Sequence, residues 1–289
     1  MWAVGLRRCA RWGAQRGPAW WLEYSPGPIA MLAGVLASKQ RHRATALMEW
    51  LGQPKGASWQ LLRNYGHCLA ESFATQRPAS VEVIGREHLP DASARGVVLA
   101  TAHTGAWEVA AGALHQEHGI AVRLGLEPEV HPGVWALHEA SRRERGLEGI
   151  ALEASPASAL ALLNQVQGGG LVALQVDRPG HSKRTLSSVL LGRQLALAEG
   201  PFRIAKLAGA PLVPVFNARL GFLRYQIEVF PAIHIPANAT PAQLLSAAQR
   251  VTDCFEIFLR RFPTQWFHFV DSPLAPRITS SVESLPVRQ

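Results

Sequence analysis

The chain has 289 residues, of which 48% are hydrophobic and 17% are charged. This composition excludes a disordered chain and allows one large domain, or one domain with an N-terminal appendage. Lysine and arginine number 29 against 21 aspartate and glutamate, which gives a formal net charge of +8. That charge favours an anionic partner, such as lipid headgroups, an acidic carrier protein or nucleic acid, without choosing among them.

Cysteine usage and apolar runs set two further limits. Cys9, Cys68 and Cys254 lie far apart and form no CxxC pair, which argues against a disulfide framework and a cysteine zinc site and fits a reduced compartment. The longest apolar candidate, residues 28–37, is too short to cross a bilayer of ~30 Å. The early arginines are not followed by the apolar core of a secretory signal.

Residues 1–80 are predicted to form an N-terminal helical segment, with helical spacing over 44–51 and 59–73. Aromatic residues stand among arginines beside the short apolar run: Trp12, Trp20, Trp21 and Tyr24 with Arg7, Arg8, Arg11 and Arg16. Aromatics and cations flanking a shallow apolar segment suit a membrane headgroup interface. The same residues equally fit a buried helix whose tryptophans pack on the main domain.

From residue 81 the sequence pattern changes to short β-rich runs that alternate with predicted helices. The predicted strands are 81–84, 97–101, 121–124, 171–176, 189–191, 212–216 and 225–230. Helices are expected from Pro156, with Ser155 as N-cap, and from Pro201 to Gly209. This alternation predicts an α/β fold, a mostly parallel central sheet sandwiched by helices, over 81–272. Residues 273–289 are expected to be a flexible C-terminal tail.

The most informative stretch is residues 101–108, Thr-Ala-His-Thr-Gly-Ala-Trp-Glu, between a strand and a helix. A histidine at a strand exit can act as a base, and a carboxylate can fix its tautomer and stabilise the imidazolium. We therefore expect His103 to be the base and Glu108 its orienting partner. Gly105 permits the connecting turn. A solvated histidine and a glutamate favoured by a helix N-terminus fit the same spacing.

Two later clusters add charged candidates. Asp177 and Arg178 follow another apolar strand, and Arg178 could hold a phosphate or carboxylate bidentately. Most residues of the stretch 191–216 fit a purely structural role, and the polar exceptions are Arg193, Glu199 and Arg203. Substrate binding by Asp177, Arg178, Arg193 and Arg203 competes with simple salt bridging for each of them.

These blocks together carry a family resemblance. Residues 103–108 resemble the motif of bacterial lipid A biosynthesis acyltransferases, roughly H-x-G-x-W-E, within the wider glycerolipid acyltransferase superfamily. Asp177-Arg178, residues 191–193, Gly200-Pro201 and residues 210–215 follow in the order and spacing of that family's later blocks, and residues 81–89 resemble its preceding strand. The resemblance covers about 60–272. The short N-terminal apolar segment and the reduced acidic block at 177–180 depart from typical members and leave the acceptor open.

The resemblance implies transfer of a fatty acyl group from acyl carrier protein or coenzyme A to a lipid hydroxyl. His103 and Glu108 would be catalytic, and backbone N–H groups from Gly105 to Trp107 would stabilise the oxyanion. Neither metal nor cofactor is expected beyond the acyl thioester. It implies a peripheral or monotopic protein on the cytoplasmic face of the bacterial inner membrane. The acceptor alternatives are a lipid A precursor, a lysophospholipid and a phosphatidylinositol mannoside.

Other functions remain as alternatives. A catalytically silent, membrane-surface lipid-binding protein on the same scaffold fits the basic N-terminus. No G-x-S-x-G serine elbow exists, His115 and His118 lack an indicated third metal ligand, and no recognition motif supports nucleic-acid binding. His268 is expected to be a packed core histidine near the site.

Overall fold

The N-terminal part of the chain is entirely helical. A computed structural model describes residues 2–89, 96–129, 131–153, 155–179 and 184–269, so the tail predicted over 273–289 lies outside the described residues. The first five helices are α1 (Trp2–Arg16), α2 (Ala19–Tyr24), α3 (Pro26–Leu36), α4 (Ser38–Trp50) and α5 (Ala57–Ser72). Within the described residues, none of the helices is long and apolar enough to cross a bilayer.

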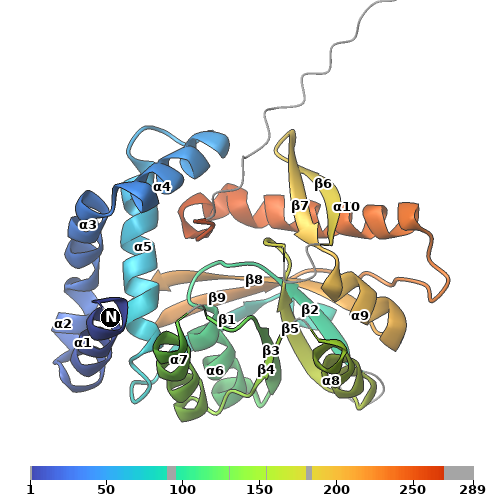
Figure 1. The fold of residues 1–289 in the computed structure, drawn as a ribbon, viewed down its shortest axis with the longest axis horizontal. Coiled ribbons are helices and arrows are strands. Elements are labelled where there is room, and N and C mark those ends of the chain that lie inside the picture. The colour runs from blue at the N-terminus through green and yellow to red at the C-terminus, as the bar shows by residue number, and fades with distance from the viewer. Residues whose placement is uncertain (1, 90–95, 130, 154, 180–183, 270–289) are drawn as a thin grey trace, which may run out of the picture.

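A seven-stranded sheet forms the centre of the molecule (Figure 1), in the order β1-β9-β8-β2-β5-β3-β4. Its strands are β1 (Ser80–Ile84), β2 (Val97–Thr101), β3 (Val122–Leu126), β4 (Gly149–Ala151), β5 (Leu171–Gln175), β8 (Leu212–Gly221) and β9 (Arg224–Val229). Neighbouring strands run parallel except β8 and β9, which form an antiparallel hairpin. All five residues of β2 are buried, as expected for a central strand covered on both faces.

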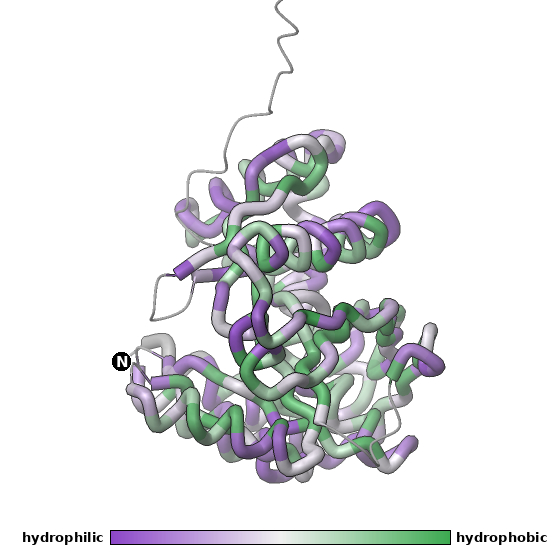
Figure 2. The backbone as a smooth tube through the Cα atoms, turned by 90° about the vertical axis from the view of Figure 1, so that its right-hand side faces the viewer, coloured by the Kyte–Doolittle hydropathy of each residue, from purple (hydrophilic) through white to green (hydrophobic). Residues whose placement is uncertain are grey.

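Helices cover both faces of this sheet (Figure 1). They are α6 (Trp107–His118), α7 (Pro132–Glu144), α8 (Pro156–Gln167), α9 (Gly200–Ala208) and α10 (Pro241–Arg261), with short 3₁₀ turns η1 (Arg86–His88) and η2 (Pro263–Gln265). Figure 2 shows hydrophilic and hydrophobic residues interspersed along the helices, as expected for helices with one face on the core. The antiparallel hairpin β6 (Thr185–Leu190) and β7 (Arg193–Ala198) packs on α10.

Local sequence signals explain where several of these elements begin and end. The α10 helix begins with a complete capping box, in which Thr240 and Gln243 satisfy each other's backbone N–H groups. The α9 helix carries Pro201 in its first turn and ends at Gly209, whose left-handed backbone closes it. Ser155 precedes α8 as predicted, but its side chain makes no capping hydrogen bond.

The predicted fold class is confirmed: a mostly parallel sheet lies between helices, with helices before it in the chain. The predicted strands are all present within a few residues, except that the run 189–191 is the end of a longer strand, β6. The strands β4 and β7 were not anticipated, because β4 is only three residues long and β7 carries polar residues in its first half.

A buried carboxylate ties the N-terminal helices to the sheet. Glu71 on α5 is fully buried and accepts two hydrogen bonds from Arg219 of β8, at 2.9 Å and 2.7 Å to Oε1. Tyr225 of β9 donates its hydroxyl to the other carboxylate oxygen. The Arg145 side chain, just after α7, donates to the Glu71 carbonyl at 2.7 Å. A charge this deep is tolerated only because it is paired and fully hydrogen-bonded.

We expect Glu71→Gln to lower the free energy of unfolding by about 3 kcal/mol, because it leaves the Arg219 charge buried without its counter-ion. Denaturant unfolding followed by circular dichroism measures this. Glu139→Gln is the matched control, since Glu139 pairs with Arg143 at the surface of α7 and its loss should change stability by less than about 0.5 kcal/mol. Equal effects of the two substitutions would contradict the role of Glu71.

Candidate active site

The register between β2 and β5 places two polar side chains together. The strands are parallel, and Thr101 pairs with Gln175 at their carboxyl ends. His103 and Asp177 each follow their strand by two residues and therefore leave the sheet side by side. The His103 Nδ1 atom lies 2.8 Å from Asp177 Oδ1. Ligands of parallel α/β sheets collect at this edge.

The Asp177 carboxylate is buried among hydrogen-bond donors. Its Oδ1 also accepts from the His103 backbone N–H at 3.2 Å, and its Oδ2 accepts from the indole N–H of Trp266 at 2.8 Å. Burial alone would raise the pKa of Asp177, but His103, His268 and Arg178 hold that pKa well below its ordinary value. Asp177 is therefore an ionised carboxylate at neutral pH.

His103 is held as a neutral base that solvent can reach. Its side chain is 25% exposed, while Nδ1 is engaged by Asp177, so Nε2 is the nitrogen that can accept a proton. Burial lowers the pKa of His103, and the charges of Arg178 and His268 act in the same direction. Asp177 opposes them but does not reverse the shift. An ionised carboxylate on Nδ1 and a low pKa are the properties of a general base with an orienting partner.

The expected hydrogen bond between His103 and Glu108 is wrong. Glu108 is the second residue of α6, is 7% exposed, and pairs with Arg142 of α7 at 2.8 Å. Its other oxygen lies 3.8 Å from Nδ1 of His138. Burial would raise the pKa of Glu108, but His138 and Arg142 lower it below the ordinary value. The carboxylate on the neighbouring strand end, not the one five residues along the chain, contacts the imidazole, because strand register brings it closer.

The turn after His103 has the glycine conformation that the sequence predicts, but the Gly105 N–H does not fit the predicted oxyanion-binding role. Gly105 has φ +51°, and a Cβ there would lie 2.7 Å from the Asn217 carbonyl oxygen, so this position requires glycine. Its N–H donates to the Gln265 carbonyl at 3.1 Å, and it is therefore not free to bind an oxyanion as predicted. Trp107 begins α6, whose first-turn N–H groups have no partner within the helix.

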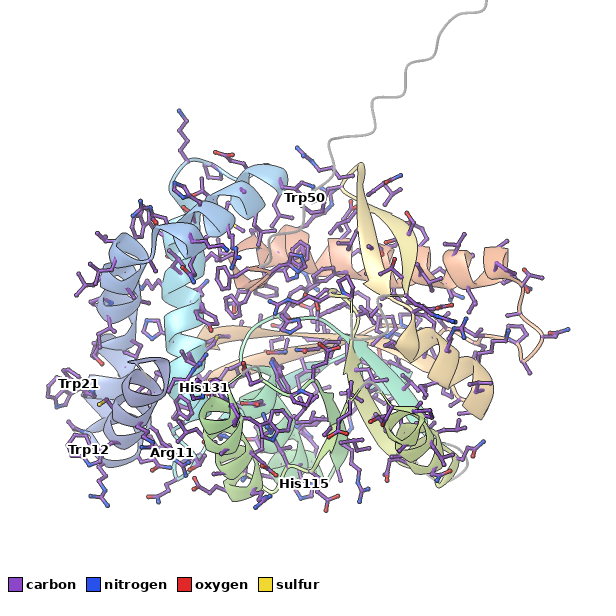
Figure 3. All side chains as sticks on the ribbon, in the orientation of Figure 1. Arg11, Trp12, Trp21, Trp50, His115 and His131 are labelled. Atoms are coloured by element: carbon purple, nitrogen blue, oxygen red, sulfur yellow. The ribbon has the colours of Figure 1, made fainter. Side chains whose placement is uncertain are left out.

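The three arginines predicted to bind substrate lie in different surroundings. Arg178 is half-buried and donates to the Phe267 carbonyl, near His103. Arg193 lies over the ring of Trp50, at 5.7 Å from its centroid, and Trp50 in turn packs against Trp266. Figure 3 shows Trp50 at the end of the helical segment that faces the β6–β7 hairpin. Arg203 pairs with Glu199 one helical turn earlier, at 2.8 Å, which is the salt-bridge alternative.

Residues 69–271 match the family model described as bacterial lipid A biosynthesis acyltransferase. The chain belongs to the bacterial lipid A biosynthesis acyltransferase family. It is thus an acyltransferase of lipid metabolism. No curated protein matches the chain. A solved structure that resembles it is the 1-acyl-sn-glycerophosphate (LPA) acyltransferase of Thermotoga maritima, at 14% identity, a TM-score of 0.40, and coverage of 82% of this chain and 95% of that one.

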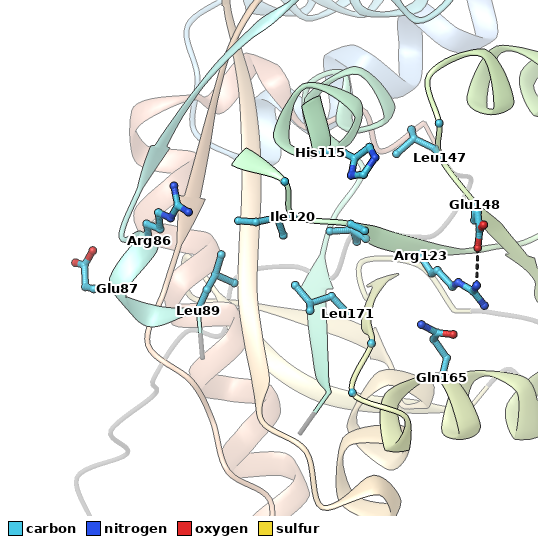
Figure 4. A pocket seen from close by; sticks show the side chains of 16 residues that line it. Arg86, Glu87, Leu89, His115, Ile120, Arg123, Leu147, Glu148, Gln165 and Leu171 are labelled. Atoms are coloured by element: carbon cyan, nitrogen blue, oxygen red, sulfur yellow. Dashed lines mark ion pairs between the residues drawn. The ribbon is translucent and has the colours of Figure 1, made fainter. Parts of the chain in front are cut away.

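A hollow of about 1200 Å³ lies at the amino ends of β3 and β5 in this acyltransferase, opposite the strand ends that carry His103 and Asp177 (Figure 4). It is lined by the starts of β3 and β5 and by the ends of α6 and α8. Arg123 and Glu148 of its lining form an ion pair at 2.6 Å. His103 stands at the carboxyl end of the neighbouring parallel strand, so this hollow is separate from the turn of residues 102–106 that carries His103. Across the described ranges, no group of three or more metal-ligating side chains is positioned to hold an ion.

Sequence reasoning missed Trp266 as a site residue and named His268 only as a neighbour. Both belong to the segment after η2, which runs along the catalytic turn: Trp266 forms an isolated bridge with Thr104, and the Phe267 N–H donates to the His103 carbonyl at 2.8 Å. The signal available was the aromatic run 266–269 with one histidine, which does not by itself indicate what it packs against.

Gly105→Ala should destabilise the acyltransferase by about 3 kcal/mol, from the strained backbone and the clash with Asn217 together. Thermal and denaturant unfolding measure the loss. Gly119→Ala is the matched control, because Gly119 also has positive φ, +67°, but open space around its Cβ position, and should cost about 1 kcal/mol. If both variants lose the same stability, the packing of the catalytic turn against Asn217 is not the constraint.

Proposed function

We propose that this protein transfers a fatty acyl chain from an acyl thioester to the hydroxyl of a lipid A-type glycolipid, with His103 as general base and Asp177 as its positioning residue. The observation that carries the proposal is the 2.8 Å contact between His103 Nδ1 and a buried, ionised Asp177, at the binding edge of the sheet. Membership of the lipid A acyltransferase family supports the acceptor class.

The reaction follows from this geometry without an acyl-enzyme. His103 Nε2 takes the proton of the acceptor hydroxyl while its oxygen bonds to the thioester carbonyl carbon. The tetrahedral intermediate then expels the thiolate, which takes the proton from the imidazolium. An ester and a free thiol result. Asp177 stabilises the imidazolium formed in the first step, and base assistance of this type contributes ~10²–10⁴-fold in rate.

The donor is acyl carrier protein or coenzyme A, and the charge balance of the chain bears on both. Each donor is an anionic thioester, one through an acidic protein surface and the other through phosphates. The formal net charge of +8 attracts either of them over the distance that salt permits. Arg178 is the nearest candidate for an anionic group, since it is held beside His103 through the Phe267 carbonyl.

We expect His103→Ala to abolish transfer of a labelled acyl chain from acyl carrier protein or coenzyme A to a lipid extract. Asp177→Asn should lower kcat by about 10²-fold or more, because the amide cannot stabilise the imidazolium. Asp253→Asn is the matched control, since Asp253 is exposed on α10 and accepts a hydrogen bond from Gln249 of the same helix at 2.8 Å. Mass spectrometry of the product identifies the acceptor and chain length.

Wild-type turnover by folded His103→Ala or Asp177→Asn protein would overturn this assignment. Binding of lipid by the wild-type chain with no transfer from either donor would instead support the silent lipid-binding alternative.

We further propose that helices α1–α3 dock on an anionic membrane surface, at the cytoplasmic face of the bacterial inner membrane. The exposed large apolar residues of this segment are Trp12, Trp20, Trp21, Tyr24, Ile29, Met31, Leu32, Val35 and Leu36. Figure 3 places Trp12 and Trp21 at the outer edge of the molecule. Arg8 and Arg16 are exposed on the same helices. An apolar surface of this extent, with aromatics and cations, suits the headgroup interface of a bilayer.

Serine substitution of Leu32 and Leu36 together should weaken binding to phosphatidylglycerol-containing vesicles about tenfold or more, because each leucine contributes by burial in the lipid. Co-sedimentation and tryptophan fluorescence measure the binding. Leu160→Ser is the matched control, since Leu160 is an exposed leucine of α8, outside the N-terminal helices. Unchanged vesicle binding by the double variant would contradict docking through α3.

A further inference from the structure

A second imidazole faces the carboxylate that holds the catalytic histidine. His268 is buried, and its Nδ1 lies 3.6 Å from Asp177 Oδ2, on the side of the carboxylate away from His103. That nitrogen makes no hydrogen bond. The oxygens of Asp177 are thus divided: Oδ1 serves His103, and Oδ2 faces Trp266 and His268.

The surrounding packing fixes His268 in this position. Its ring lies against the Trp266 indole, with 4.8 Å between ring centroids, and Trp266 is fully buried between Trp50 and Phe255. Hydrogen bonds from Gly105 to Gln265 and from Phe267 to His103 attach this segment to the catalytic turn. His268 is therefore fixed by the same packing and hydrogen bonds that hold the turn after His103.

We propose that His268 is a positioning residue that shares the Asp177 carboxylate with His103, so that the two imidazoles are coupled through it. The inference rests on the proposed function in treating His103 as the base. A positive charge on His268 would be balanced by Asp177, and Asp177 would then stabilise the imidazolium of His103 less. A positive charge on His103 would act on His268 in the same way. Ionisable groups that interact this closely titrate as a pair.

The other charged groups around His103 and His268 shift the pKa of His103 in a known direction. Asp177 lies between the imidazoles, and Arg178 faces them from the loop after β5. Arg43 of α4 lies farther along, where it donates to the Phe269 carbonyl at 3.1 Å. The charges of His268 and Arg178 both lower the pKa of His103, in addition to burial. Arg178 is unchanged in every His268 variant, so a substitution of His268 isolates the contribution of His268 to the His103 pKa.

The test follows the protonation of His103 by NMR of ring-labelled histidine, with the His103 signal identified from the His103→Gln spectrum. In His268→Gln the side chain keeps an N–H group on the Oδ2 side of Asp177 but carries no positive charge. We expect the His103 midpoint to move to higher pH by about half a unit. Asp177→Asn should move it to lower pH. His115→Gln is the matched control, because His115 is exposed at the end of α6.

An unchanged His103 midpoint in His268→Gln would overturn the coupling. Because this titration needs no turnover, it succeeds or fails independently of whether the chain transfers an acyl group from the donors tested. Where turnover is measured, the acid limb of kcat/KM should move with the His103 midpoint. The positioning role has its own readout: His268→Leu lowers kcat about tenfold with KM unchanged, and His268→Gln retains the wild-type kcat. Equal losses in both variants would refute it.

Discussion

The parallel pairing of β2 with β5 is the constraint on which the site depends. Thr101 opposite Gln175 sets His103 opposite Asp177, and neither residue has another means of reaching its partner. Because side chains alternate between the faces of a strand, a slip of one residue would send one of the pair to the wrong face. Buried side chains along both strands, including Val98, Ala100, Val172 and Leu174, lock this register, so the hydrophobic core and the catalytic geometry are specified by the same residues.

Glu108 and Asp177 both lie near the turn that carries His103, and they have different partners. Glu108 is paired with Arg142, whose guanidinium also lies over the Trp135 ring and keeps its charge throughout a reaction. That pair stabilises reactant and transition state alike and fixes the start of α6 against α7. Asp177 is paired with an imidazole, whose charge would change in the proposed proton transfer. Only an interaction that strengthens in the transition state accelerates a reaction, and under the proposed mechanism the Asp177 pair meets that condition whereas the Glu108 pair does not.

The sequence was sufficient for the fold class and the strands of the central sheet, and it singled out His103, which lies at the carboxyl end of β2. Alternating apolar runs predict strands because burial imposes that pattern, and Gly200-Pro201 and Gly209 mark a helix through backbone preference alone. The partner of His103 was assigned by proximity along the chain, which pointed to Glu108. Contacts between residues 74 positions apart depend on strand order and register, which short-range patterns do not contain. Trp266 and His268 reach the site by the same kind of long-range pairing. So does Gln265, whose carbonyl accepts a hydrogen bond from the Gly105 N–H.

The N-terminal helices and the catalytic turn are connected through buried polar contacts rather than through a flexible linker. Glu71 of α5 binds Arg219 and Tyr225 of the β8–β9 hairpin, and β8 is the strand that pairs with β2. Asn217, two residues before Arg219, packs against Gly105 and its backbone N–H lies 3.4 Å from the Thr104 hydroxyl. Gln265 bonds both the N–H and the carbonyl of Arg219 while it holds Gly105. If the helical layer docks on a membrane as proposed, these hydrogen bonds between α5, β8 and the segment after η2 would hold the turn after His103 at a fixed position relative to the lipid surface.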